Sequence, residues 1–224
     1  MNVEDIYARG TTTFMGLELA VARDVLIPRE ETELLATTVL NLLKDKPAPR
    51  VIDVCCGAGN ISCTVAARIP GARVWASDLS EAAAALTQEN ARRLGFGERV
   101  SAVAGDLFAK LEGLGLEDGI DLVACNPPYI SESKLAGASS FLLDHEPREA
   151  FDGGPYGLSI HTRVIKECLP FLRRGGYLAF EVGAGQDRQV TMLFKRGKVY
   201  EEVRAVPNAS GEGRVVLGRR TDAP

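Results

Sequence analysis

Four consecutive residues, Asn126-Pro127-Pro128-Tyr129, combine groups that could hold a planar NH2 group. They follow an apolar segment, 120–125, that is typical of a buried strand, and two prolines cannot continue a helix or a strand ladder. The Asn126 amide and the Pro127 carbonyl could each accept a hydrogen bond from the NH2 group, while the Tyr129 ring lies against its plane. The alternative is an ordinary proline turn after a strand. The motif predicts three catalytic residues: Asn126, Pro127 and Tyr129.

A second motif, in residues 51–60, predicts a buried strand that runs into a glycine turn and then into a helix. Gly57 and Gly59 allow the backbone to approach a ligand closely and to adopt angles that other residues resist. The following strand ends in Asp78, about 20 residues beyond the turn, where doubly wound folds place the acid that binds a ribose. A further acid, Asp106, follows the third strand. The alternative is that the glycines only make a tight turn between strand and helix.

The glycine motif departs from the full dinucleotide-binding pattern, because position 62 is Ser62 instead of a third glycine. This departure favours a smaller nucleoside, such as S-adenosyl-L-methionine, over a dinucleotide. Asp53, in the strand before the turn, would suit a cationic ligand electrostatically. A nucleoside site beside a turn that holds an NH2 group predicts methyl transfer to nitrogen.

Strands and helices alternate along most of the chain, which predicts an α/β fold with a doubly wound, mostly parallel seven-stranded sheet, helices on both faces and an antiparallel C-terminal strand pair. We expect residues 1–47 to form a hairpin and a helix packed on the core, and residues 48–224 to form the catalytic domain. The expected strands are 50–54, 73–77, 100–104, 120–125, 177–182, 200–206 and 214–217, and the expected helices are 29–44, 60–69, 80–94, 158–172 and 186–195.

A long irregular segment, 130–156, follows the proline motif directly. Loops longer than about 15 residues are uncommon and often functional, so we expect a mobile lid over the substrate. Gly137, Gly153 and Gly154 are its possible hinges, and its apolar group 141–143 would be poorly placed in permanent solvent. His145 in this segment is either a proton acceptor or a packing residue.

Composition excludes several classes of protein. The 224-residue, 24.0 kDa chain has a net charge of −4, so no global field attracts nucleic acid or anionic membrane. No apolar run approaches the roughly 20 residues that span a bilayer. The five cysteines form no CxxC pair, so we expect no metal and small core thiols in a reducing compartment. The expectation is a cytoplasmic protein without membrane partners.

Several motifs together make the chain resemble the HemK-like protein-(glutamine-N5) methyltransferases over most of its length. The Asn-Pro-Pro-Tyr motif and a glycine turn mark amino methyltransferases generally, whereas the segment 28–33 and the glycines near position 153 are more specific to this family. The resemblance is carried by residues 26–33, 53–59, Asp78, Gly105-Asp106, 126–129, Glu146-Pro147, Ala150, Gly153-Gly154, Gly157-Leu158, Glu181-Val182-Gly183 and Gln186.

The resemblance implies the class I methyltransferase fold, S-adenosyl-L-methionine as cofactor, and an acceptor nitrogen held by Asn126, Pro127 and Tyr129. The cofactor-binding residues that it implies are Asp53, Gly57, Gly59, Asp78, Asp106, Leu107 and Asn126. An amide nitrogen is a poor nucleophile, so acceptors on both N–H bonds would orient it and stabilise its developing positive charge. Positioning would supply much of the catalysis.

The chain departs from the family pattern in two places. Only 25 residues precede Leu26, too few for the N-terminal helical domain that helps such enzymes dock a release factor. The family's glycine segment carries an acid before its last glycine, whereas Tyr156 precedes Gly157. A partner protein could replace the docking domain.

Four functions stay open at the level of sequence. The first is methylation of a glutamine amide in a protein, and the second is methylation of a small amino acid, guanidine or amide metabolite. A nucleic-acid adenine methyltransferase is disfavoured by the acidic charge balance. A non-catalytic nucleoside-binding module is disfavoured by the intact motif at residues 126–129.

Overall fold

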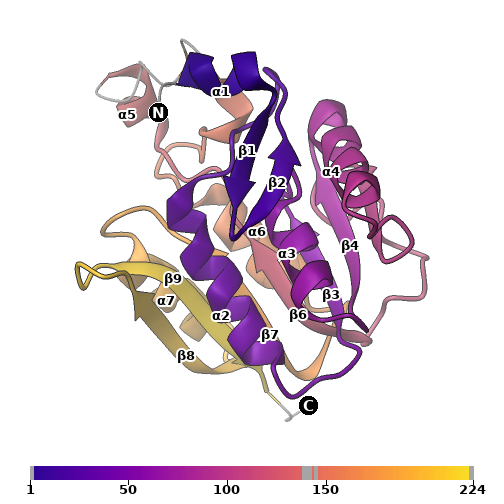
Figure 1. The fold of residues 1–224 in the computed structure, drawn as a ribbon. Helices are drawn as coiled ribbons and strands as arrows, with labels where there is room; N and C mark the ends of the chain where they lie inside the picture. The colour runs from indigo at the N-terminus through magenta and orange to yellow at the C-terminus, as the bar shows by residue number, and fades with distance from the viewer. Residues whose placement is uncertain (1–2, 138–142, 144–145, 222–224) are drawn as a thin grey trace.

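The computed structural model describes residues 3–137, 143 and 146–221 of the chain. Its centre is a seven-stranded sheet with the strand order β5-β4-β3-β6-β7-β9-β8 (Figure 1). The first five strands in this order are parallel, and β9 is antiparallel to both of its neighbours. The strands are β3 (Arg50–Val54), β4 (Arg73–Asp78), β5 (Val100–Ala104), β6 (Ile120–Cys125), β7 (Leu172–Glu181), β8 (Tyr200–Pro207) and β9 (Gly213–Arg220). The predicted fold class is confirmed.

Helices cover both faces of this sheet, because the central strands are apolar on both sides. Ile52 and Val54 point into a core shared with α6 and α7, whereas Val51 points into a core shared with α2 and α3. The two layers lie behind and in front of the sheet in Figure 1. The helices are α1 (Val3–Arg9), α2 (Glu33–Leu43), α3 (Asn60–Arg68), α4 (Glu81–Arg93), α5 (Glu132–Ala136), α6 (Ser159–Glu167) and α7 (Asp187–Arg196).

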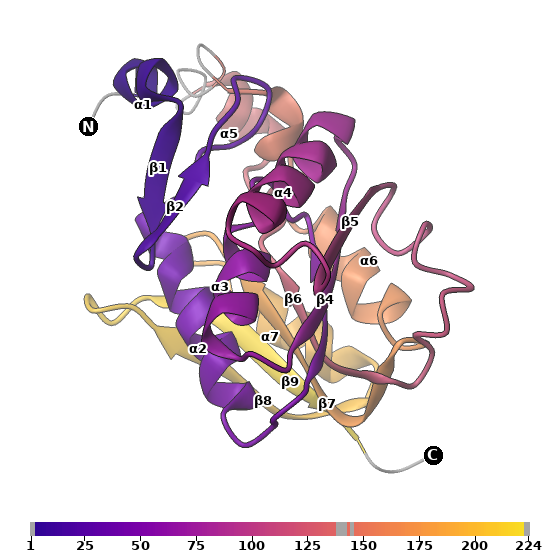
Figure 2. The same cartoon turned by 45° about the vertical axis from the view of Figure 1, so that its right-hand side comes forward.

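The N-terminal segment forms α1 and a hairpin of β1 (Thr11–Phe14) and β2 (Leu17–Ala20), and this hairpin was expected within residues 1–47. Phe14 and Leu19 from the hairpin are buried with α2 in the second core. Figure 2 shows α1 and α5 at the same end of the molecule. Helix α1 was not predicted, because seven residues are too few to establish a helical period, and none of its side chains is buried. The domain boundary after residue 47 stays a prediction.

A buried amide on α4 helps to attach the hairpin to the sheet layer. Asn90 on α4 is fully buried, accepts a hydrogen bond from the Ala20 N–H at 2.7 Å, and donates to the Ala20 and Ala58 carbonyls at 3.1 and 2.9 Å. These three backbone groups belong to the end of β2 and to the glycine turn. Asn90 therefore joins three segments that are far apart in the sequence.

Several predicted element boundaries were wrong. A strand was expected at 177–182, because the two glycines at 175–176 suit a turn, but β7 is continuous from Leu172. The pairing of β7 with β6 shifts register after Ile120. The glycines form an irregular bulge, in which Gly175 has a φ of +71°. The helix expected at 158–172 is α6, which ends at Glu167.

The helix expected at 29–44 also begins differently. It opens with a 3-10 turn, η1 (Glu30–Thr32), and α2 follows from Glu33. The expected lid 130–156 includes α5 and a second 3-10 turn, η3 (Arg148–Ala150). His145, Phe141 and Leu142 lie outside the described residues, so the proposed roles of His145 and of this lid stay predictions.

We expect Asn90→Ala to lower the free energy of unfolding by about 3 kcal/mol, because it leaves the Ala20 and Ala58 backbone groups buried without partners. Chemical denaturation of both proteins measures this difference. Asn41→Ala, at an exposed position of α2, is the matched control and should change stability by less than about 0.5 kcal/mol. Equal effects of the two substitutions would contradict the assignment of Asn90 as the link.

Candidate functional site

The carboxyl ends of four neighbouring parallel strands form the floor of the site. The register pairs Val54 with Ser77 on one side and with Cys125 on the other, and Cys125 pairs in turn with Phe180. Neighbouring strands lie roughly 4.8 Å apart, so the residues that follow these pairs form one row across the sheet. The row is Asp78 on β4, Cys55 after β3, Asn126 after β6 and Glu181 on β7.

The glycine turn after β3 departs from ordinary backbone angles at three positions. Cys55, Gly57 and Gly59 have φ values of +60°, +55° and +78°. A side chain at Gly57 would meet no atom within 4 Å, whereas one at Gly59 would come within 2.9 Å of the Thr87 side chain on α4. Gly57 thus leaves open space for a ligand beside the turn, and Gly59 allows α3 and α4 to pack.

Asp78 fixes this turn and also lines the cleft above it. Its Oδ2 accepts a hydrogen bond from the Gly57 N–H at 2.9 Å, and its Oδ1 accepts one from the Ser80 N–H at 3.0 Å. Burial raises the pKa of the carboxyl, and these backbone N–H groups lower it. We call this space the glycine-turn cleft; its lining includes Asp24, Leu26, Gly57, Asp78, Leu79, Asp106, Leu107, Asn126 and Ala150.

Asp106 and Leu107 also line the glycine-turn cleft. Both Asp106 carboxylate oxygens accept hydrogen bonds from the Arg163 guanidinium, at 2.9 and 3.0 Å, which holds the acid in one orientation. Leu107 is buried, and its φ of +50° is uncommon for a residue with a branched side chain. The sequence prediction placed both residues at the cofactor, and both lie at this cleft.

Asp53 and Gly59 are not part of the cleft lining. Asp53 is buried beneath the turn, where its Oδ2 accepts hydrogen bonds from the Ser62 N–H at 3.0 Å and the Ser62 hydroxyl at 2.6 Å. Burial raises the pKa of Asp53 to about 7, against the lowering effect of Ser62. A direct contact between Asp53 and a cofactor stays a prediction; its observed contacts hold the first turn of α3.

Asn126 stands between two clefts. It lines the glycine-turn cleft and also a second cleft, which we call the acceptor cleft. Pro127 and Tyr129, the other predicted catalytic residues, line the acceptor cleft. Its charged lining residues are Arg29, Glu31, Glu146, Glu181 and Arg214. A group bound in one cleft could therefore meet a group bound in the other at Asn126.

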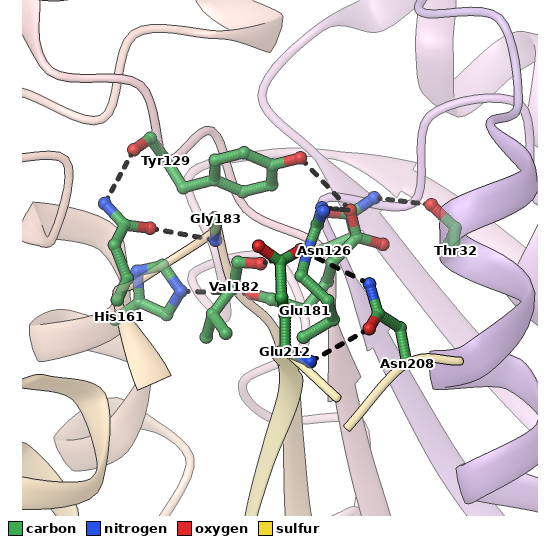
Figure 3. A network of polar contacts seen from close by, with 11 residues as sticks. Thr32, Asn126, Tyr129, His161, Glu181, Val182, Gly183, Asn208 and Glu212 are labelled. Atoms are coloured by element: carbon green, nitrogen blue, oxygen red, sulfur yellow. Dashed lines mark hydrogen bonds and ion pairs between the residues drawn. The ribbon is translucent and has the colours of Figure 1, made fainter. Parts of the chain in front are cut away.

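Hydrogen bonds hold the side chains of the proline motif in place (Figure 3). The Asn126 Nδ2 donates to the Thr32 hydroxyl at 3.1 Å, and the Tyr129 hydroxyl donates to Oε1 of Glu181 at 3.2 Å. Burial and the Glu181 carboxylate raise the pKa of Tyr129 to about 12, so the phenol stays protonated and able to donate. The Gln186 amide donates to the Tyr129 carbonyl at 2.9 Å.

The glycines near position 153 pack against the backbone of this motif. A side chain at Gly153 would come within 2.8 Å of the Pro128 carbonyl oxygen, and one at Gly157 within 2.2 Å of the Tyr129 carbonyl oxygen. Hydrogen bonds from Ile130 N–H to Phe151 O and from Gly153 N–H to Ile130 O close the base of the segment. Only glycine allows these backbones to approach so closely.

An ion pair joins the segment before the core to the segment after the motif. Glu146 is buried, accepts a hydrogen bond from the Ile27 N–H at 3.0 Å and is paired with Arg29. The hydrogen bond between Ile27 and Glu146 spans 119 positions of the sequence. It explains why both the 26–33 segment and Glu146 carried the family resemblance, since together they form one wall of the acceptor cleft.

No role in the site was predicted from the sequence for Thr32, Glu181 or Arg214. Thr32 and Glu181 belong to motifs that carried the family resemblance, so a signal for both was present. Arg214 lies on β9, and its Nη2 is 4.0 Å from Oε1 of Glu181. Its position beside the site depends on the antiparallel insertion of β9, which the local sequence does not specify.

Comparisons with known proteins agree with this geometry. Residues 30–146 match the family model of the methyltransferase small domain. The release factor glutamine methyltransferase of Moorella thermoacetica is 38% identical over 216 residues, which are 96% of this chain and 75% of that protein. The protein of the same description from Gloeobacter violaceus is 37% identical over 211 residues, covering 94% of this chain and 72% of that protein.

A solved structure extends the comparison to the fold. The human methyltransferase 10 domain containing protein superimposes with a TM-score of 0.65 at 16% sequence identity, over 97% of this chain and 98% of that chain. At this identity the likeness concerns the fold alone. The overall fold is therefore shared with a protein of very different sequence.

We expect Asp78→Asn to weaken binding of S-adenosyl-L-methionine by roughly 10- to 100-fold, because an amide NH2 facing the Gly57 or Ser80 N–H disturbs the turn and removes an acceptor. Titration calorimetry on the full chain measures this affinity. Asp45→Asn, on the exposed surface, is the matched control and should bind as the wild type does. Unchanged affinity in Asp78→Asn would show that Asp78 is not the cofactor anchor.

Proposed function

Because this chain belongs to the release factor glutamine methyltransferase family, we propose that it methylates the side-chain amide nitrogen of a glutamine in a peptide chain release factor. The chain is an S-adenosyl-L-methionine-dependent N-methyltransferase. The release factor is the acceptor named for the relatives, and the features of the acceptor cleft support it here.

The observation that carries the proposal is the position of Asn126 on the wall shared by the two clefts. S-adenosyl-L-methionine, when bound in the glycine-turn cleft, supplies an electrophilic methyl group. An acceptor amide in the neighbouring cleft would then meet it at Asn126. The predicted catalytic residues Asn126, Pro127 and Tyr129 do not have to be rearranged to bring both groups together.

The residues of the glycine-turn cleft fit a nucleoside with a charged amino-acid tail. The space beside Gly57 is open, and the Asp78 oxygens each keep a lone pair beyond those used by the backbone. Asp106 offers a fixed carboxylate in the lining of the same cleft. We assign cofactor binding to Gly57, Asp78, Asp106, Leu107 and Asn126, with Asp53 and Gly59 acting through the turn.

The catalytic residues act by orientation. The Asn126 Oδ1 and the Pro127 carbonyl accept hydrogen bonds from the two N–H groups of the acceptor amide. The Tyr129 ring packs on the plane of that amide. Acceptors on both hydrogens direct the nitrogen toward the other cleft and stabilise the positive charge that develops on it. Bringing the two reactants together in this orientation removes much of the entropic cost of the reaction.

The shape of the acceptor cleft favours a peptide over a free metabolite. A third cleft, lined by Gly183, Gln186 and Lys134, adjoins the acceptor cleft and shares Tyr129 and Ile130 with it. Two adjoining clefts give an extended chain room on both sides of the methylated residue. An enclosed site would suit a small metabolite better. Nucleic acid is disfavoured because three acids outnumber the two arginines in the lining of the acceptor cleft, which therefore has no excess of positive charge to attract phosphates.

Methyl-transfer assays with the full chain separate these acceptors. We expect methylation of a purified bacterial release factor at one glutamine, located by peptide mass spectrometry, and no methylation of free glutamine or of an RNA hairpin. Labelling of free glutamine in place of the release factor would favour the small-molecule alternative. A docking partner, if one is required, would be detected as stimulation by cell extract.

We expect Asn126→Ala to leave the affinity for S-adenosyl-L-methionine nearly unchanged and to lower kcat by on the order of 100-fold, the scale observed when a preorganised transition-state partner is removed. Calorimetry and single-turnover methylation measure the two quantities. Asn41→Ala serves as the control for asparagine removal on an exposed helix face. Wild-type turnover in Asn126→Ala would contradict the assigned mechanism.

A further inference from the structure

Glu181 is a buried carboxylate at the end of β7 whose role the proposed mechanism does not use. Only 2% of the residue is exposed, and its Oε1 accepts the hydrogen bond from the Tyr129 hydroxyl. No hydrogen bond of normal geometry reaches its Oε2 from the described residues. A carboxylate buried with so few partners costs stability, so its retention beneath the catalytic motif calls for a functional reason.

Thr32 lies between this carboxylate and the catalytic amide. Its side chain is buried, lowers the pKa of the Glu181 carboxyl through hydrogen bonding, and accepts the hydrogen bond from Asn126 Nδ2. A threonine hydroxyl has one proton and can both donate and accept, whereas an ionised carboxylate can only accept. Since Thr32 already accepts from Asn126 and the buried Oε2 of Glu181 has no hydrogen-bond partner among the described residues, we take the Thr32 proton to face Glu181.

We propose that Glu181 is a positioning residue that sets, through the Thr32 hydroxyl, which atom of the Asn126 amide faces the acceptor nitrogen. The chain runs from Asn126 Nδ2 to the Thr32 hydroxyl through a hydrogen bond, and from that hydroxyl to the Glu181 carboxylate through the interaction that lowers the carboxyl pKa. With Nδ2 held in this way, Oδ1 is the amide atom presented to the substrate. The inference rests on the proposed function, because the acceptor is taken to be an NH2 group.

The orientation matters because an asparagine amide is nearly symmetric in shape but opposite in hydrogen bonding at its two ends. Rotation by half a turn would present an NH2 group to the NH2 group of the substrate, and two donors repel. A carboxylate at the end of the chain also polarises the hydroxyl and the amide, which strengthens Oδ1 as an acceptor. The same carboxylate holds the Tyr129 hydroxyl, so Glu181 supports both sides of the acceptor site.

The charge state of Glu181 gives the arrangement a pH dependence. Burial raises the pKa of its carboxyl; the Thr32 hydroxyl, Arg214 and Tyr129 lower it, and Glu31 raises it. The paired charges of Arg29 and Glu146 line the same cleft. The Nε2–H of His161 donates to the Glu181 backbone carbonyl, 3.1 Å away, and burial lowers the pKa of His161 to about 4.

A raised pKa means that the carboxylate is lost at a higher pH than for an exposed glutamate. Turnover should therefore fall as the pH decreases through the pKa of Glu181, because a protonated Glu181 can donate to Thr32 and allow the Asn126 amide to rotate. Removal of the Thr32 hydroxyl removes an interaction that lowers this pKa. The acidic limb of the kcat profile should accordingly move to higher pH in Thr32→Val.

Substitutions that keep the shape of the side chains test the inference. In Glu181→Gln, the oxygen of the new amide can still accept the hydrogen bond from the Tyr129 hydroxyl, while the NH2 of the same amide donates to Thr32. The Thr32 proton then turns toward Asn126, and the Asn126 amide rotates. We expect kcat to fall roughly 10- to 100-fold with unchanged affinity for S-adenosyl-L-methionine. Thr32→Val should reduce kcat less than Glu181→Gln does. Thr32→Ser keeps the hydroxyl and should have the kcat of the wild type.

Thr38→Val is the matched control for loss of a buried threonine hydroxyl. Thr38 lies on α2 and donates within its own helix, to Leu34 O at 2.7 Å, so its loss should leave kcat unchanged. Thermal unfolding of all variants separates a loss of stability from a loss of positioning. Equal kcat in wild type, Glu181→Gln and Thr32→Val would overturn the inference, and so would a failure of Thr32→Ser to restore turnover.

A second measurement does not depend on activity. In a protein with 15N-labelled asparagine, the Asn126 side-chain N–H protons should show a hydrogen-bonded shift and slow exchange in wild type and Thr32→Ser. Both features should be lost in Thr32→Val. Identical Asn126 amide signals in these three proteins would contradict the bond chain, whatever the acceptor is. A wild-type enzyme that methylates no release factor, with these signals as expected, would instead count against the proposed function alone.

Discussion

The site depends on the parallel register of β4, β3, β6 and β7. Parallel pairing places the carboxyl ends of neighbouring strands at the same edge, and the chain changes direction across the sheet between β3 and β6, where doubly wound folds bind their ligands. Asp78 and Asn126 reach opposite sides of the glycine turn for this reason alone. A shift of one residue in any of these strands would turn the corresponding side chain to the other face.

Buried polar groups carry the next level of organisation. Asn90, Glu146 and Thr32 each connect segments that are 70 to 119 positions apart in the sequence, and each does so through hydrogen bonds made within the protein. Every such group gives up its hydration on folding and is stable only when its partners are in place. These residues therefore couple the shape of the two clefts to the completeness of the fold.

The sequence allowed the strand ends to be predicted because each signal is local: an apolar run followed by a glycine, an acid or a proline. Asp78, Gly57 and Asn126 are of this kind. Thr32 and Glu181 could not be assigned roles, because their roles depend on the packing of α2 against β6 and β7. The glycines at 175–176 show the limit of local reasoning, since a turn and a bulge require the same backbone freedom.

The closed base of the segment that follows the proline motif has a consequence for evolution. Ile130 pairs with Asp152, and Gly153 rests on the Pro128 carbonyl, so the chain leaves and re-enters the catalytic region at nearly the same place. Lengthening a loop whose ends are already joined costs little entropy. The stretch after Ser131 can thus change in length at little cost, as long as Glu146 keeps its bonds to Ile27 and Arg29 and Ala150 keeps its place at the glycine-turn cleft. Such changes let the range of acceptors diversify while the transfer machinery is left intact.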